Sequence, residues 1–181
     1  ALKNLFNLRD GHITRETMLA YTLVTNSSGN YYSVCKTGDD IVGNVNIPET
    51  YNNFPVKEIV AEGFKGCSKI KKVTIPSSIT KVNASAFYDS SATEVLFKGE
   101  TTEIERDAFS YCQSLTNVNL PKKLEVVSQA AFSVCSKLKE IIIPNTVKTI
   151  SDSAFNFCRE LRSIVIPDSV QTLGYASFSS C

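Results

Sequence analysis

The sequence predicts a repeat solenoid, in which short units stack side by side with little α-helix, and three repeated features support this prediction. Phenylalanine recurs about once every 23 residues, at Phe64, Phe87, Phe109, Phe132, Phe155 and Phe178. A small residue precedes each phenylalanine, and a cysteine follows three residues after all but one of them. A hydrophobic residue followed by proline recurs in five of the six units. Units that match at several positions in phase indicate stacked coils, because one such unit cannot bury its apolar face alone.

Length and composition fit one folded array and exclude several classes of protein. The 181 residues are 43% hydrophobic and 20% charged, which is typical of a folded, soluble chain. The formal net charge is only +1, so the sequence lacks the concentrated positive charge of a nucleic-acid-binding protein. No apolar run reaches the roughly 20 residues that a spanning helix needs. We therefore expect no nucleic-acid partner and no membrane span.

The clearest unit is LKEIIIPNTVKTISDSAFNFC, residues 138–158. Leu138, Ile141 and Ile143 have the L-x-x-L-x-L spacing of a leucine-rich repeat, in which a short strand turns alternate side chains inward. Pro144 then ends the strand, because proline cannot donate to a β-ladder. The fold class predicted is therefore a leucine-rich-repeat horseshoe, with a parallel β-sheet on its concave face and short strands, turns and 3-10 segments on its convex side.

The array is expected to occupy residues 45–181, as about six units of which the last is truncated. Residues 1–44 do not match the repeat and are predicted to be a lead-in and cap, because the first coil would otherwise expose its apolar edge. The first unit carries an insertion, so Thr50–Pro55 is expected to bulge as a loop. The sequence stops at Cys181 without a polar cap, which favours a fragment, a longer parent chain, or an edge-to-edge contact between copies.

Within the lead-in, the local signals predict two helices and two strands. Asn4–Leu8 and Thr14–Ala20 are expected to form short helices, although the capping signal at Thr14 is weak. Tyr21–Val24 and Asn30–Cys35 are expected to form strands around the polar turn Asn26–Gly29.

Five of the six cysteines share one position of the repeat, so they are expected to form an inward-facing column with neighbours about 4.8 Å apart. We interpret them as buried thiols rather than disulfides, because side chains on successive parallel coils point the same way. A zinc site needs four converging ligands, and one ligand per coil cannot surround an ion. The sequence therefore predicts no metal and no cofactor.

Acid–base chemistry is also poorly represented. His12 is the only histidine, and no nucleophile motif such as G-x-S-x-G accompanies it, so a solvated surface histidine is the favoured interpretation. Asp39 and Asp40 follow Gly38 in an expected turn, and a glycosidase would need a cleft around such a pair. The sequence therefore predicts no enzyme activity and no catalytic residues.

The recurring unit can be written L-x-x-I-x-I-P-x-x-V-x-x-I-x-x-x-A-F-x-x-C. It closely resembles the 23-residue repeat of BspA-type leucine-rich-repeat surface proteins of bacteria and some parasitic protists, from about Val45 to Cys181. This resemblance implies secretion or surface display and a role in adhesion or protein recognition, with fibronectin- and fibrinogen-type host proteins reported as ligands of some members. It carries no catalytic residue across, because the family motif contains none.

The best candidates for ligand binding are the outward-facing residues of the repeated strands. The central row contains Asn46, Thr74, Leu96, Asn119, Ile142 and Val165, and the flanking rows contribute Lys72, Glu94, Asn117, Glu140 and Arg162. The central row becomes apolar toward the carboxyl end, and an apolar strip with a polar rim is typical of a recognition surface. The alternative is that Ile and Val are there only because they favour strands.

The sequence thus favours a non-catalytic, extracellular or cell-surface recognition module. It would bind a protein or glycan, for example a host extracellular-matrix protein, on its concave sheet. The alternative is a structural spacer in a longer surface protein, with no ligand of its own.

Overall fold

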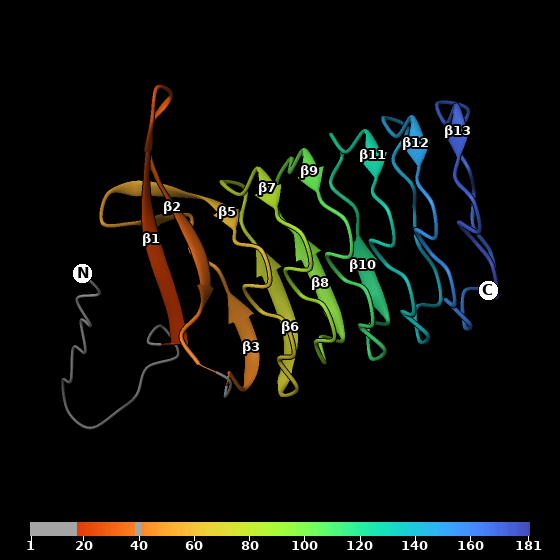
Figure 1. Cartoon of the computed structure of the whole chain (residues 1–181), viewed down its shortest axis with the longest axis horizontal. Coiled ribbons are helices and arrows are strands. Elements are labelled where there is room, and N and C mark those ends of the chain that lie inside the picture. Colours follow the sequence, from red (N-terminus) through yellow and green to blue (C-terminus); the bar gives the residue numbers. More distant parts are fainter. Residues whose placement is uncertain (1–17, 39–40) are drawn as a thin grey trace.

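The computed structural model describes residues 18–38 and 41–181, and there the chain winds into successive turns that stack along one axis (Figure 1). The regular elements of the described residues are short β-strands, and none of them is an α-helix. The solenoid predicted from the repeat is therefore confirmed.

The amino end of the described chain is a β-hairpin. Strands β1 (Leu19–Asn26) and β2 (Gly29–Lys36) pair antiparallel, and the side-chain oxygen of Asn26 accepts a hydrogen bond from the Ser28 amide at 2.9 Å in the turn. Strand β2 then pairs in parallel with β5 (Phe54–Ile59) of the first turn. The hairpin predicted from the polar turn is thus confirmed, and it covers one edge of the array.

The helix predicted at Thr14–Ala20 is wrong where it can be compared, because Leu19 and Ala20 begin strand β1. Both residues pair with the end of β2, and pairing with a neighbouring strand outweighs a weak local helix signal. The rest of that segment, and the helix predicted at Asn4–Leu8, lie outside the described residues.

One side of the solenoid is a parallel sheet of four strands. We call it the longer sheet because its strands have three to six residues, whereas most strands on the opposite side have two. Its strands are β3 (Gly43–Asn46), β6 (Ile70–Ile75), β8 (Glu94–Phe97) and β10 (Asn117–Asn119), which pair in the order in which they occur along the chain. Valines at the same position of each strand pair in register and are buried: Val45, Val73, Val95 and Val118. The alternation predicted from the repeat therefore places one face of this sheet in the core.

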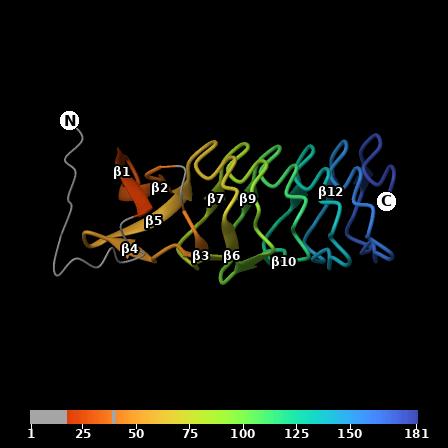
Figure 2. The same ribbon diagram turned by 90° about the horizontal axis from the view of Figure 1, so that it is seen from below.

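The opposite side is built from shorter parallel strands (Figure 2). After β5 these are β7 (Lys81–Val82), β9 (Glu103–Ile104), β11 (Val126–Val127), β12 (Thr149–Ile150) and β13 (Thr172–Leu173). Strands β5, β7 and β9 form a sheet with the hairpin, and β11, β12 and β13 form another. The second residue of β7, β9, β11 and β12 is buried, so both sides of the coil contribute to one continuous core.

The insertion in the first unit forms a hairpin rather than the loop expected at Thr50–Pro55. Strand β4 (Thr50–Tyr51) pairs antiparallel with the start of β5. The two residues of the turn, Asn52 and Asn53, have φ of 45° and 67°, a left-handed conformation that asparagine tolerates and that two-residue hairpins require.

A column of stacked phenylalanine rings runs through the core. From Phe64 to Phe178 the ring centroids of successive turns are 5.0–5.6 Å apart, and the ring planes are within 4–8° of parallel. The rings from Phe64 to Phe155 are fully buried. The period in the sequence therefore corresponds to turns that lie directly over one another.

The last two turns depart from the predicted sheet. Residues 138–143 and 161–166 match the repeat but form no strand. The opposite side of the same turns stays paired, from β11 through β12 to β13. The loss of strand pairing is therefore confined to the side of the longer sheet.

Candidate binding face

The outer face of the longer sheet aligns the predicted binding residues in two rows. Pairing places Thr74 beside Leu96 and Leu96 beside Asn119, and it places Lys72 beside Glu94 and Glu94 beside Asn117. The rows follow from the repeat, because a parallel ladder keeps equivalent residues opposite one another. We call this surface, with its continuation over the last two turns, the candidate face.

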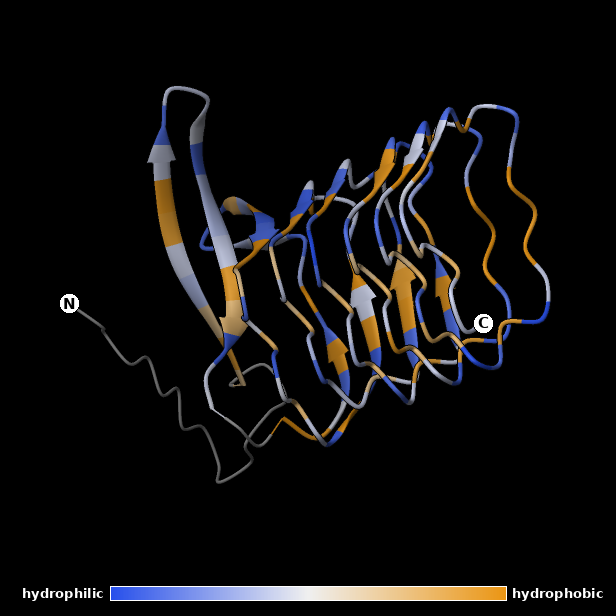
Figure 3. Cartoon of the chain, turned by 45° about the vertical axis from the view of Figure 1, so that its right-hand side comes forward, coloured by the Kyte–Doolittle hydropathy of each residue, from blue (hydrophilic) through white to orange (hydrophobic). Residues whose placement is uncertain are grey.

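The apolar part of the candidate face lies on the last two turns. Ile142 is 84% exposed and Val165 is 81% exposed, although both are large hydrophobic residues. Ile141 and Ile143, the neighbours of Ile142, are buried, so the inward and outward alternation continues there without strand pairing. Around Val165 the alternation is weaker, because Ile164 is half-buried and Ile166 is 36% exposed. The Arg162 amide donates to the Lys139 carbonyl at 3.4 Å, which keeps these two turns in the same register. Figure 3 shows hydrophobic segments of ribbon reaching into these turns.

A groove lies on the carboxyl-terminal half of the candidate face. Its volume is about 740 Å³, and four of the predicted residues line it: Asn117, Asn119, Glu140 and Ile142. The loops that follow β8 and β10 line it as well, including Lys98, Glu100 and Lys122. The groove was not predicted, because the wall formed by these loops has no signature in the repeat motif.

Two ion pairs occupy part of this surface. Lys72 and Glu94 are 3.1 Å apart, and each side chain is about one third exposed. At the groove Lys123 and Glu100 are 2.6 Å apart. Each pair offsets its own charge, so a ligand would meet these four residues as hydrogen-bonding groups more than as net charges.

Asn119 has a structural role that the sequence did not reveal. Its side-chain amide donates to the Phe97 carbonyl at 2.9 Å and accepts from the Phe97 amide at 2.9 Å. The side chain thus satisfies both backbone groups at the end of β8. Both polar groups of the Asn119 side chain are therefore engaged by the backbone of the preceding turn.

The cysteine column is buried except at Cys181, which is exposed, and four of its thiols are bonded to the backbone of the preceding turn. Cys112, Cys135, Cys158 and Cys181 each donate from sulfur to the carbonyl of the phenylalanine one turn earlier, at 3.1–3.2 Å. Burial raises the pKa of Cys112 to about 11 and that of Cys158 to about 12. Such thiols remain protonated and are poor nucleophiles, in agreement with the prediction of buried thiols, and no cysteine is in a disulfide.

The other chemical candidates fall outside the described residues or are not assembled there. His12, Asp39 and Asp40 are not among the residues that the structure describes. Within the described ranges, no cluster of three or more His, Cys, Asp or Glu side chains is placed to hold a metal ion. The same part of the chain contains no helix that is both long and apolar enough to cross a membrane.

The repeat also matches a known family. The family described as the BspA type leucine rich repeat region matches residues 57–181, where six copies of its repeat are found. The chain belongs to this family. Membership in the BspA-type family indicates that the chain is a repeat module, and such modules suggest protein–protein interaction. The family is not one that indicates a catalytic activity. No curated protein sequence matches the chain.

Solved structures of bacterial repeat proteins resemble this BspA-type chain. The pneumococcal vaccine antigen PcpA is 28% identical with a TM-score of 0.75, and the match covers 94% of this chain and 48% of PcpA. A Treponema pallidum leucine-rich-repeat protein is 24% identical with a TM-score of 0.73, over 89% of this chain and 86% of that one. A Faecalibacterium prausnitzii protein described as a leucine rich cell surface protein is 23% identical with a TM-score of 0.60, over 89% and 50%.

Two of these matches cover only about half of the related protein. The BspA-type chain spans about half the length of PcpA and of the Faecalibacterium protein. The matches to the Treponema and Faecalibacterium proteins, both below 25% identity, establish the fold alone.

Proposed function

We propose that this chain is a non-catalytic recognition module, displayed outside the cell or at its surface, that binds a protein or glycan through the candidate face. The observation that carries the proposal is the groove of about 740 Å³ beside the 84% exposed Ile142. A groove that joins exposed apolar surface to a polar rim offers both contact area and hydrogen-bonding groups. Extracellular-matrix proteins of a host are the partners to test first.

The distribution of charge favours a partner that is bound by shape and hydrogen bonds. The exposed groove residues Lys98 and Lys122 carry the opposite charge to Glu140, so no single sign dominates. Electrostatic steering of the partner should then be weak, and salt should change the affinity little.

Display at the cell surface is supported by descriptions of related structures. The Faecalibacterium protein is described as a cell surface protein, and PcpA as a vaccine antigen.

The proposal also includes self-association at the edge of the last turn, where Leu173 and Tyr175 are 55% and 85% exposed. Sedimentation velocity over a range of concentrations tests that contact.

The test of the candidate face is a double substitution, Ile142→Asp with Val165→Asp. Purified chain is immobilised and exposed to a panel of matrix proteins and to a glycan array, and retained ligands are measured by surface plasmon resonance. The variant should bind about tenfold more weakly or worse, because it places two charges in the apolar strip. Its circular dichroism should be unchanged, because both side chains are exposed.

A matched control carries Val126→Asp with Tyr111→Asp, which changes two exposed apolar residues outside the candidate face. Its affinity should stay within about twofold of the original. Equal binding by the Ile142 and Val165 variant would dismiss the candidate face. A chain that retains nothing from either panel would instead support the structural spacer.

A further inference from the structure

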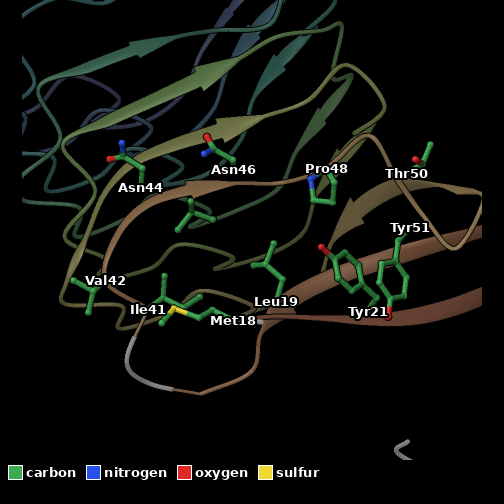
Figure 4. Close-up of a pocket in the computed structure, with 11 residues that line it drawn as sticks. Met18, Leu19, Tyr21, Ile41, Val42, Asn44, Asn46, Pro48, Thr50 and Tyr51 are labelled. Atoms are coloured by element: carbon green, nitrogen blue, oxygen red, sulfur yellow. The ribbon is translucent and has the colours of Figure 1, made fainter. Parts of the chain in front are cut away.

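A second cavity lies at the amino end of the array, away from the groove. Its volume is about 500 Å³, and it is enclosed by the start of β1, by β3 and by β4 (Figure 4). The described residues that line it include Met18, Leu19, Ile41 and Val42, and none of these described lining residues is charged. We call it the end pocket.

One wall of the end pocket is the edge of strand β3 that faces away from β6, and no other described strand pairs with this edge. The Gly43 and Ile47 amides donate toward the next turn, to the carbonyls of Lys69 and Thr74 at 2.9 and 3.2 Å. Successive residues of a strand direct their backbone groups to opposite edges. The N–H and C=O groups of Asn44 and Asn46 therefore face the other edge, where the end pocket lies.

The amino-terminal hairpin leaves this edge uncovered. Strand β2 pairs with β5, whereas among the described strands β3 pairs only with β6. The hairpin thus closes one sheet of the first turn and not the longer sheet. An open strand edge beside an apolar surface is a template for another strand.

Aromatic side chains make one end of the pocket rigid. The rings of Tyr21 and Tyr51 are stacked with centroids 3.9 Å apart, and Tyr32 packs edge-on against both. Both stacked rings line the pocket (Figure 4). A wall that is already packed loses little conformational freedom when a ligand binds.

We propose that the end pocket binds an extended, uncharged peptide segment of a partner protein, which adds to the edge of β3 as a further strand. Alternating N–H and C=O groups at Asn44 and Asn46 are matched by another extended backbone. The lining that the structure describes is mostly apolar and uncharged, so it accepts the alternate apolar side chains of that segment and disfavours charged ones. Strand β3 has four residues, so the paired part of the peptide is about four residues long.

The end pocket uses the backbone edge at Asn46, whose side chain lies in the central row of the candidate face, but it shares no lining residue with the groove. Binding at the end pocket and binding at the groove can therefore fail separately. The probe is the peptide acetyl-Lys-Thr-Val-Thr-Val-Thr-Lys-amide, whose terminal lysines keep it soluble. Two further peptides carry N-methyl groups either on both valines or on the three threonines. Only one of these sets of amides can face β3, so one N-methylated peptide should bind about tenfold more weakly or worse and the other should bind like the parent. Titration calorimetry with the full chain measures all three.

A variant tests the protein side of the same pairing. Asn46→Pro removes an N–H on the open edge while leaving the bonds to β6, because proline is tolerated where the N–H faces outward. It should weaken binding of the parent peptide about tenfold. The matched variant Asn46→Thr keeps the N–H and should bind within about twofold of the original.

Amide hydrogen exchange completes the test. Without peptide the Asn44 and Asn46 amides should exchange rapidly, and the peptide should slow both of them. Slow exchange without peptide would overturn the proposal, because it would mean that another segment or a second copy already covers the edge. Equal affinity for all three peptides, or no binding of the parent peptide, would also overturn it.

Discussion

At the scale of single residues, each turn of the solenoid depends on two positions with left-handed backbone. They lie two residues before and two residues after the stacked phenylalanine, in all six turns. Of these twelve residues only Gly66 is a glycine. Hydrogen bonds between turns offset the strain, because each phenylalanine amide from Phe64 to Phe155 donates at 2.7–2.9 Å to the carbonyl of the small residue before the next phenylalanine. A small residue there allows the two backbones to approach.

Replacing one left-handed residue by glycine should therefore stabilise the protein. Ala130 has a φ of 51°, a conformation that costs an L-residue free energy and costs glycine almost none. Ala130→Gly should raise the free energy of unfolding by about 0.5–1 kcal/mol after allowing for the greater freedom of glycine in the unfolded chain. Urea unfolding measures the change.

The matched control is the neighbouring residue Ala131, which is fully buried and has no positive φ. Ala131→Gly should lower the free energy of unfolding by about 1–2 kcal/mol, because it removes a buried methyl group and gains no relief of strain. If both variants lost stability equally, the left-handed position would not be strained.

The cysteine column makes a second prediction at this scale. Because burial raises the pKa of Cys112 to about 11, its thiolate population at pH 8 should be about 100-fold lower than in the unfolded chain. Iodoacetamide should then alkylate Cys112 at least about 100-fold more slowly in buffer than in denaturing urea. Peptide mass spectrometry follows the rate at this site. Comparable rates would show that the buried thiol is accessible.

At the scale of elements, the sequence predicts those structural features that are set by a residue's position in the repeat. A residue type that recurs once per coil must stack, so the phenylalanine column and the buried valine rows follow from the period alone. The insertion breaks that period, and the hairpin at Asn52 and Asn53 was expected only as a loop. An Asn-Asn pair between short extended segments was the available signal, because asparagine tolerates the left-handed turn.

The candidate face shows where such prediction stops. Rows of outward residues follow from the period, but the bonds of Asn119 depend on the backbone of Phe97 in the preceding turn. The segment around Ile142 pairs with no strand of the described residues, although it matches the repeat and isoleucine favours strands. The open edge of β3 depends on which sheet the amino-terminal hairpin joins. Each of these is a relation between elements that no single unit encodes.

One side chain joins two neighbouring turns in a way that pH should reveal. The Glu49 carboxylate accepts hydrogen bonds from the Ser77 hydroxyl at 2.6 Å, the Ser77 amide at 3.2 Å and the Ser78 amide at 2.8 Å. These bonds, the Ser77 hydroxyl foremost, lower the pKa of Glu49. The carboxylate therefore stabilises the folded state above the pKa of the unfolded chain, and this contribution is lost as the pH falls through the lowered folded pKa.

Glu49→Gln should lower the free energy of unfolding at pH 7, because an amide oxygen accepts these bonds less strongly than a carboxylate. The difference between variant and original protein should shrink toward zero at about pH 3, where the unfolded carboxyl is protonated. Chemical unfolding at both pH values measures the two differences. Glu140→Gln, at an exposed position, is the control and should show no such change. A loss that is equal at both pH values would assign the effect to packing rather than charge.

At the scale of the whole molecule, stability should be a sum of interfaces between neighbouring turns. The Phe109 ring is fully buried, and its centroid lies 5.2 Å from that of Phe87 and 5.3 Å from that of Phe132. Phe178 stacks on Phe155 alone in this chain, at 5.4 Å, and is partly exposed. The same residue type therefore has two interfaces in the interior and one at the last turn.

Phe109→Ala should consequently lower the free energy of unfolding by about 3–5 kcal/mol, the range for a fully buried phenylalanine. Phe178→Ala should lose about half as much, because it removes one ring contact and less buried area. Urea unfolding at equal protein concentration measures both, and Phe109→Leu, which preserves most of the volume, should lose less than Phe109→Ala. Equal losses at Phe109 and Phe178 would contradict the summation over neighbours, since they would mean that the last turn is held as firmly as the interior.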